Sequence, residues 1–228
     1  MSRPSPLILA VDTTDIDRVY RLIEETRDFV SIFKFGLEFY LRHGLETLQT
    51  LKSSASIEIF LDLKLHDIPN TVGKAAEAIS GLAPRILTVH SGGGGEMVKA
   101  AVAALPQTSI AAVTVLTSLD QAELTEMGIE TELSELVLSF ASSSVTAGAT
   151  AVVASPHEVA RLRAHFPETI LITPGIRPMD LGDDQRRTMT PRQAIEAGST
   201  YLVIGRPITG SVSPRDSAKE ILAAIGER

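Results

Sequence analysis

Runs of apolar and β-branched residues recur along the chain, and a stretch with helical periodicity follows each of them. The runs predict eight strands, at residues 7–12, 31–36, 57–64, 86–90, 111–116, 151–155, 170–175 and 201–206. The stretches between and after them predict helices, at residues 15–27, 37–51, 70–82, 95–105, 119–147, 156–165, 190–197 and 214–226. Strands that alternate with helices pair in parallel, because each helix returns the chain to the same end of the sheet. The pattern therefore predicts a (β/α)8 TIM barrel of the α/β class, with a doubly wound open sheet as the second choice.

Several helix ends carry local signals that agree with this pattern. Thr14 or Asp15 can cap the first helix, Pro191 stands near the start of the helix at 190–197, and Gly198 follows its end, where a positive φ is needed. The longest connection, residues 116–151, is expected to hold a short helix before the main crossover helix. No linker or composition shift marks a boundary, so we expect residues 1–228 to form a single domain.

Composition and charge narrow the function classes. The 228 residues include no cysteine, which excludes disulfides and a thiol nucleophile and fits a reducing cytoplasm. The net charge of −7 argues against a nucleic-acid surface, so an anionic ligand would need a local positive pocket. The first apolar run meets Asp12 too soon for a signal peptide or a membrane span. We expect a soluble, cytoplasmic protein without a membrane partner.

Ligands of such barrels gather where the strands end, on the loops that lead into the helices. The residues at the predicted strand ends are therefore the site candidates: Asp12, Lys34, Asp62, Lys64, His90, Thr117, Ser155, the loop 174–178, Gly205 and Arg206. Few of them are apolar. We expect His90 to be a wall residue and not an acid or base.

The third predicted strand carries the densest group of charges. Alternation places Asp62 and Lys64 on the face opposite the aliphatic residues of that strand, and Asp67 follows on the loop. Lys34 ends the neighbouring strand, so the four side chains are expected to form an array of alternating charge. Opposite charges ~4 Å apart attract by about 4 kcal/mol at an effective dielectric near 20, which can hold all four ionised. A purely structural salt-bridge network is the simpler reading of this motif taken alone.

The chain resembles the orotidine 5′-monophosphate decarboxylase family over essentially its whole length. The segments that carry the resemblance occur in the family's order, at residues 10–12, 33–36, 62–71, 115–118, 173–178, 182–187 and 203–207. The most specific of them is Asp-Leu-Lys-Leu-His-Asp-Ile-Pro-Asn-Thr at 62–71. Every catalytic position of the family pattern is matched.

The resemblance implies a role for each charged residue of the array. Lys64 would be the general acid that protonates C6 of the pyrimidine as carbon dioxide leaves. Asp62 would lie beside the substrate carboxylate and keep Lys64 charged and oriented. Lys34 and Asp12 would contact the ribose hydroxyls. Neither a metal nor a cofactor is implied.

The remaining implied contacts concern the rest of the nucleotide and a second subunit. Thr117 would contact the base, and the phosphate would be surrounded by Arg177, Gln185, Gly205 and Arg206, with closure of the loop 179–187. The resemblance also implies a homodimer in which three residues reach the partner's active site: Asp67, Ile68 and Thr71.

Two other functions remain open. A magnesium-dependent decarboxylase of sugar-acid phosphates, from the same barrel family, shares the Asp-x-Lys-x-x-Asp core. The ending Pro69-Asn70-Thr71, Gln185 and Thr117 favour the nucleotide. A non-catalytic protein that binds phosphoribosyl ligands is the second alternative, and the intact Lys64 argues against it.

Overall fold

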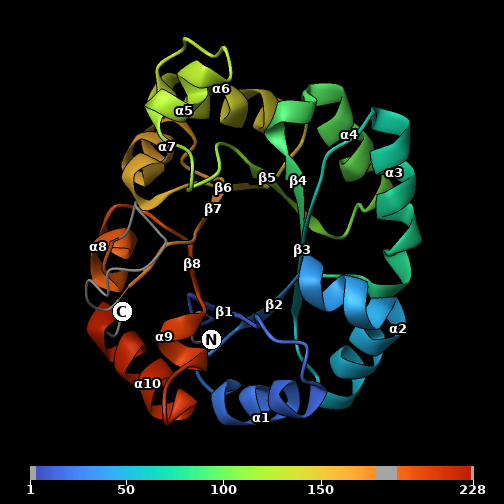
Figure 1. Ribbon diagram of the computed structural model, residues 1–228, viewed down its shortest axis with the longest axis vertical. Coiled ribbons are helices and arrows are strands. Elements are labelled where there is room, and N and C mark those ends of the chain that lie inside the picture. The colour runs from blue at the N-terminus through green and yellow to red at the C-terminus, as the bar shows by residue number, and fades with distance from the viewer. Residues whose placement is uncertain (1–3, 178–188, 227–228) are drawn as a thin grey trace.

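A closed barrel of eight parallel strands forms the centre of the molecule (Figure 1). The computed structural model describes residues 4–177 and 189–226. The strands follow in chain order: β1 (Leu7–Ala10), β2 (Ile32–Gly36), β3 (Ile59–Leu65), β4 (Ile86–His90), β5 (Ser109–Val113), β6 (Ala151–Val153), β7 (Ile170–Thr173) and β8 (Tyr201–Ile204). β1 pairs with both β2 and β8, so the sheet has no free edge. The predicted TIM barrel is confirmed, and the open sheet is wrong.

Helices form a ring around the outside of the barrel (Figure 1). The α-helices are α1 (Ile16–Thr26), α2 (Leu37–Ala55), α3 (Pro69–Ala78), α4 (Gly95–Ala104), α5 (Gln121–Glu126), α6 (Leu133–Thr146), α7 (Val159–His165), α8 (Pro191–Glu196), α9 (Arg206–Thr209) and α10 (Pro214–Ile225). Three short 3-10 turns complete them: η1 (Ser80–Leu82), η2 (Ser91–Gly93) and η3 (Pro156–Glu158). Within the described part of the chain, no helix is long and apolar enough to cross a membrane.

Most helix ends lie where the sequence places them. Asp15 caps α1 by accepting from the backbone N–H groups of Asp17 and Arg18. Thr190 caps α8, which begins at Pro191, and Gly198 beyond its end has φ of 110°. The connection after β5 does hold a short helix, α5, before α6.

The end of the eighth strand differs from the prediction. The strand was expected to reach residue 206, but β8 ends at Ile204 and Arg206 begins the four-residue helix α9. Gly205 caps this helix with φ −112° and ψ −102°, outside strand geometry. Val-Ile-Gly-Arg reads as a continuing strand in the sequence because the turn depends on the backbone of a single glycine.

Two apolar layers hold the barrel together. Inward-pointing side chains such as Ile8, Phe60 and Ile86 fill its interior. Ile59 and Leu61 alternate with Phe60 on β3 and pack outward against the helices. Each fully buried side chain of this kind contributes about 1.5–3 kcal/mol. The interior layer stops below the ends of the strands, where charged residues take over.

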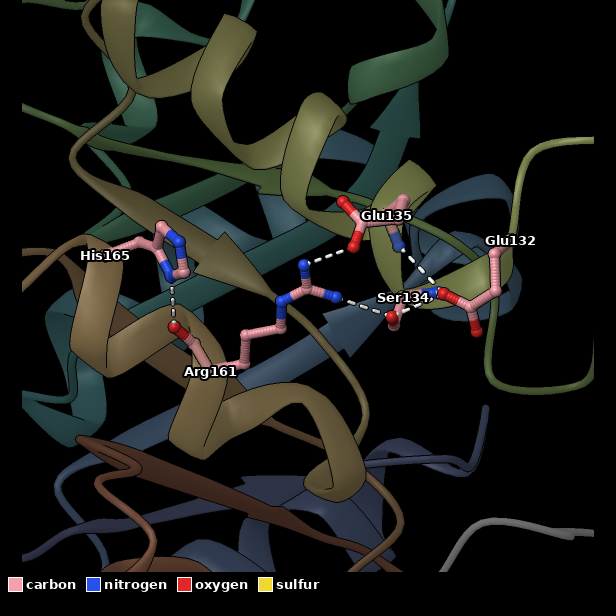
Figure 2. Close-up of polar contacts among 5 residues, drawn as sticks. All are labelled: Glu132, Ser134, Glu135, Arg161 and His165. Carbon is pink, nitrogen blue, oxygen red and sulfur yellow. Dashed lines mark hydrogen bonds and ion pairs between the residues drawn. The ribbon is translucent and has the colours of Figure 1, made fainter.

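A polar network on the outer surface joins α6 to α7 (Figure 2). The Arg161 guanidinium donates to Ser134 Oγ at 2.6 Å and to Glu135 Oε1 at 2.5 Å. Glu132 caps α6 by accepting from the Ser134 N–H at 2.9 Å, and His165 Nδ1 lies 2.9 Å from the Arg161 carbonyl oxygen. We call Glu132, Ser134, Glu135 and Arg161 the surface network.

Candidate active site

A cavity of about 240 Å³ opens at the carboxyl ends of the strands. Its polar lining comprises Asp12, Lys34, Asp62, Lys64, Thr117, Arg177 and Arg206, together with the backbone of Gly175 and Gly205. Its apolar lining includes Ala10, Phe60, Val113, Val115, Leu116, Val153 and Val203. Residues from every strand except β4, or from the loop that follows the strand, therefore meet in one cavity with polar and apolar lining.

Four charged side chains form the mouth network of this cavity: Asp12, Lys34, Asp62 and Lys64. Asp62 lies between two ammonium groups, with Oδ1 2.9 Å from Lys64 Nζ and Oδ2 3.2 Å from Lys34 Nζ. Lys34 Nζ is also 3.8 Å from Asp12 Oδ1. The side chains of Lys34 and Asp62 are each 12% exposed, whereas that of Lys64 is 38% exposed. Of the two lysines, Lys64 is therefore the one that a ligand can reach more easily.

Asp62 is held as a carboxylate. Its burial would raise the pKa, but the charges of Lys34 and Lys64, with hydrogen bonds from Lys64 and Thr88, outweigh burial and leave the pKa below its usual value. A negative charge thus persists at neutral pH beside two lysines.

The backbone of β3 departs from regular geometry at this point. Leu61 pairs with Leu87 and Leu65 pairs with Val89. Between these two pairs β3 advances by four residues while β4 advances by two, which is a β-bulge in β3. Lys64 lies in this bulge with φ of 48°, a left-handed conformation that is rare for residues other than glycine. Asp62 and Lys64 both line the cavity, as expected, but simple alternation does not account for how Lys64 gets there.

The loops after β7 and β8 form the other end of the cavity. Arg177 is only 6% exposed, and its Nη1 donates to the Ile176 carbonyl at 3.0 Å. Arg206 is exposed at the start of α9. A Cβ on Gly205 would lie 3.3 Å from Asp12 Oδ2, so this backbone passes close to the mouth network. Gln185 and the rest of the loop 179–187 lie outside the described residues.

The three residues expected to serve a partner subunit are not among the residues that line the chain's own cavity. Asp67, Ile68 and Thr71 are exposed at the start of α3, and the Ile68 side chain is 65% exposed. Asp67 Oδ1 accepts from the Ile68 N–H at 2.6 Å. Asp67 makes no ion pair with any described residue of its own chain, so in one chain Asp12 takes the fourth place in the charge array.

Thr88 is the residue of this region that sequence reasoning missed. It is 1% exposed in β4, and its Oγ1 contacts both Asp62 and the backbone of Lys64. A threonine within Ile-Leu-Thr-Val-His reads as an ordinary strand residue. Only the pairing of β3 with β4 places it beside the charges. His90 stacks on His66 with ring centroids 5.1 Å apart and does not join the described cavity lining.

No group of three or more histidine, aspartate or glutamate side chains within residues 4–177 and 189–226 is arranged to hold a metal ion. The charged lining of the cavity comprises two lysines and two carboxylates in alternation, together with two arginines from the loops after β7 and β8. This arrangement suits an anionic ligand.

Comparisons with known proteins agree with this geometry. Residues 5–221 match the model of the family described as orotidine 5′-phosphate decarboxylase / HUMPS. The chain is 46% identical to "Orotidine 5'-phosphate decarboxylase" of Thermobifida fusca (strain YX), over 97% of this chain and 96% of that one. It is 42% identical to the protein of the same name from Moorella thermoacetica, over 99% and 94%. The crystal structure of orotidine 5′-phosphate decarboxylase from Lactobacillus acidophilus superposes with a TM-score of 0.85 at 32% identity, over 98% of this chain and all of that one.

Proposed function

This chain belongs to the orotidine 5′-phosphate decarboxylase / HUMPS family, and we propose that it converts orotidine 5′-monophosphate to uridine 5′-monophosphate with Lys64 as the proton donor. The activity is that of a carboxy-lyase and is the last step of de novo pyrimidine biosynthesis. The role of Lys64 is supported mainly by one hydrogen bond: its Nζ donates to Asp62 Oδ1 at 2.9 Å, and both residues line the cavity.

Decarboxylation at C6 requires electrostatic stabilisation of the negative charge that develops on that carbon. When the bond between C6 and the carboxylate breaks, its electron pair stays on C6, where the ring carbonyls cannot easily delocalise it. A fixed ammonium at that position stabilises the developing charge with little reorganisation and then donates its proton to C6. Asp62 keeps Lys64 charged and directed, and Lys34 completes the alternation on the other side of Asp62. No cofactor is assigned a step.

The rest of the nucleotide fits the remaining lining. Asp12 and Lys34 lie together at 3.8 Å and suit the ribose hydroxyls. The phosphate is assigned to Arg177, Gln185, Gly205 and Arg206, because barrels commonly bind phosphate on the loops after strands seven and eight. Thr117 also lines the cavity and is assigned to the base. Phosphate binding far from C6 then supplies energy that is used in the transition state.

The active enzyme is proposed to be a homodimer whose sites are completed across the interface. The support is the exposure of Asp67, Ile68 and Thr71, which follow Lys64 closely in sequence but lie outside its cavity. A 65% exposed isoleucine beside an exposed aspartate suits contact with a second chain. The partner's Asp67 would then stand near this chain's Lys64.

The proposal also covers the domain organisation and the cellular location of the protein. Residues 1–228 act as one catalytic domain, since one barrel supplies every described residue that lines the chain's own cavity. The protein works in the cytoplasm, which suits a chain without cysteine.

The magnesium-dependent decarboxylase of sugar-acid phosphates is the nearest competitor. The names of the relatives favour the nucleotide, because those at 46% and 42% identity are both called orotidine 5′-phosphate decarboxylase. The non-catalytic binding protein is less favoured because Lys64 and Asp62 are intact and paired.

A spectrophotometric assay with orotidine 5′-monophosphate in the presence of a chelator tests the proposal. We expect the substrate chromophore to disappear at the same rate with and without the chelator. Activity that the chelator abolishes and magnesium restores would assign the chain to the metal-dependent class. Thermal stabilisation by uridine 5′-monophosphate without any turnover would identify a binding protein.

A further inference from the structure

Thr88 lies behind the mouth network, in the middle of β4, and is 1% exposed. Its hydroxyl makes two hydrogen bonds that use its donor and its acceptor capacity. Oγ1 donates to Asp62 Oδ1 at 2.9 Å and accepts from the Lys64 N–H at 2.9 Å. One buried hydroxyl therefore contacts both residues on which the proposed proton transfer depends.

The bulge in β3 makes this contact necessary. Lys64 lies where the register between β3 and β4 is broken, and its N–H donates to the Thr88 side chain. The left-handed φ of 48° costs about 1–2 kcal/mol for a residue with a Cβ. An acceptor placed at the Lys64 N–H stabilises this conformation against a return to regular strand geometry.

The two bonds also close a ring around Lys64. Its backbone N–H reaches Asp62 Oδ1 through Thr88, and its Nζ reaches the same oxygen directly at 2.9 Å. Asp62 Oδ1 is therefore hydrogen-bonded directly to the ammonium end of Lys64 and, through Thr88, to its backbone. Displacement of either end displaces the ammonium relative to the place where C6 binds.

We infer that Thr88 is a positioning residue for decarboxylation, which fixes the left-handed turn at Lys64 and the orientation of Asp62 so that the ammonium faces C6. It acts through these two residues, since it lies outside the described lining of the cavity. This inference rests on the proposed function.

Replacement of Thr88 by valine tests the inference, because valine keeps the shape and removes both hydrogen bonds. We expect kcat to fall about 10- to 100-fold, the usual effect of misplacing a catalytic group by about 1 Å. KM and the affinity for uridine 5′-monophosphate should change little. Thr88→Ser, which keeps the hydroxyl, should restore most of the lost kcat. Thr88→Ala removes the same two bonds and replaces the valine variant if that one does not fold.

The pH profile of kcat separates positioning from simple packing. Thr88 donates to the charged form of Asp62, whose pKa is lowered by Lys34 and Lys64 against the effect of burial. Without the hydroxyl the pKa of Asp62 rises, so the acid limb of the profile should move to higher pH in Thr88→Val and return in Thr88→Ser.

Thr173→Val is the matched control. Thr173 is equally buried in β7, and its Oγ1 is hydrogen-bonded to Ser199 Oγ at 2.6 Å, away from Asp62. It should lower the melting temperature without moving the acid limb. Wild-type kcat in folded Thr88→Val, or equal kcat losses in Thr88→Val and Thr88→Ser, would overturn the inference. Absence of turnover in the wild type would instead contradict the proposed function.

Discussion

Within the described residues, the mouth network and the surface network look alike in outline and differ in surroundings. In the mouth network, Asp62 and Lys34 are each 12% exposed and their charges lie 3.2 Å apart. In the surface network, Arg161 is 36% exposed and Glu135 is 58% exposed, at 2.5 Å (Figure 2). The shorter ion pair is the one in contact with solvent.

The difference shows that distance alone does not rank such networks. Water screens the surface pair and leaves it worth about 0–1 kcal/mol. Burial makes the charges of Lys34 and Asp62 depend on their neighbours, since removal of one partner leaves the other charge uncompensated. The mouth network therefore supports chemistry with fixed charges, whereas the surface network only helps to join α6 to α7.

The largest expected effect comes from Lys64→Ala. Loss of the proton donor and of the charge near C6 should lower kcat by at least about 10³-fold, while binding of uridine 5′-monophosphate stays largely intact. Steady-state kinetics and calorimetric titration measure the two quantities. Lys99→Ala, at a 68% exposed lysine on α4, is the control and should match the wild type. Wild-type turnover in Lys64→Ala would refute the assignment of the proton donor.

Mixing of inactive subunits asks whether Asp67 belongs to the mouth network of a partner. Asp67→Ala and Lys64→Ala should each be nearly inactive as homodimers. A heterodimer of the two contains one site with both residues intact, so activity should return to about half of the wild-type value per dimer. Heterodimers verified by two affinity tags that show no recovery would place Asp67 outside any shared site.

Arg206→Ala should have a smaller effect, confined to substrate capture. A lost charge-assisted hydrogen bond of about 1.5–3 kcal/mol corresponds to a fall in kcat/KM of about 10- to 100-fold. Arg215→Ala on α10, which removes a 3.3 Å ion pair with Asp28, is the matched control at an exposed arginine. An unchanged kcat/KM in Arg206→Ala would show that the phosphate binds elsewhere.

The smallest effect is expected in the surface network. Arg161→Ala should lower the free energy of unfolding by about 1 kcal/mol or less, with kcat unchanged and with a smaller difference at high salt. Denaturant titrations at low and high salt measure it. A fall in kcat comparable with that of Lys64→Ala would erase the distinction between the two networks.

Much of the barrel was predictable because strands and helices differ in hydrophobic period. The convergence of Asp12, Lys34, Asp62 and Lys64 was also predictable, since parallel strands place their carboxyl ends together. The bulge at Lys64 was not, because it depends on the register between β3 and β4. The role of Thr88 was hidden for the same reason, and α9 was hidden because it depends on the backbone of Gly205.

The closure of the barrel between β1 and β8 has a consequence for the assembly of the chain. Asp12 and Gly205, separated by most of the sequence, meet at this seam, where a Cβ on the glycine would lie 3.3 Å from the aspartate. A nascent or truncated chain that ends before the last strand lacks Gly205 and Arg206, which line the cavity directly after that strand. The cavity is complete only when the final strand is paired with the first, so turnover during refolding requires that pairing as well as assembly of the proposed dimer.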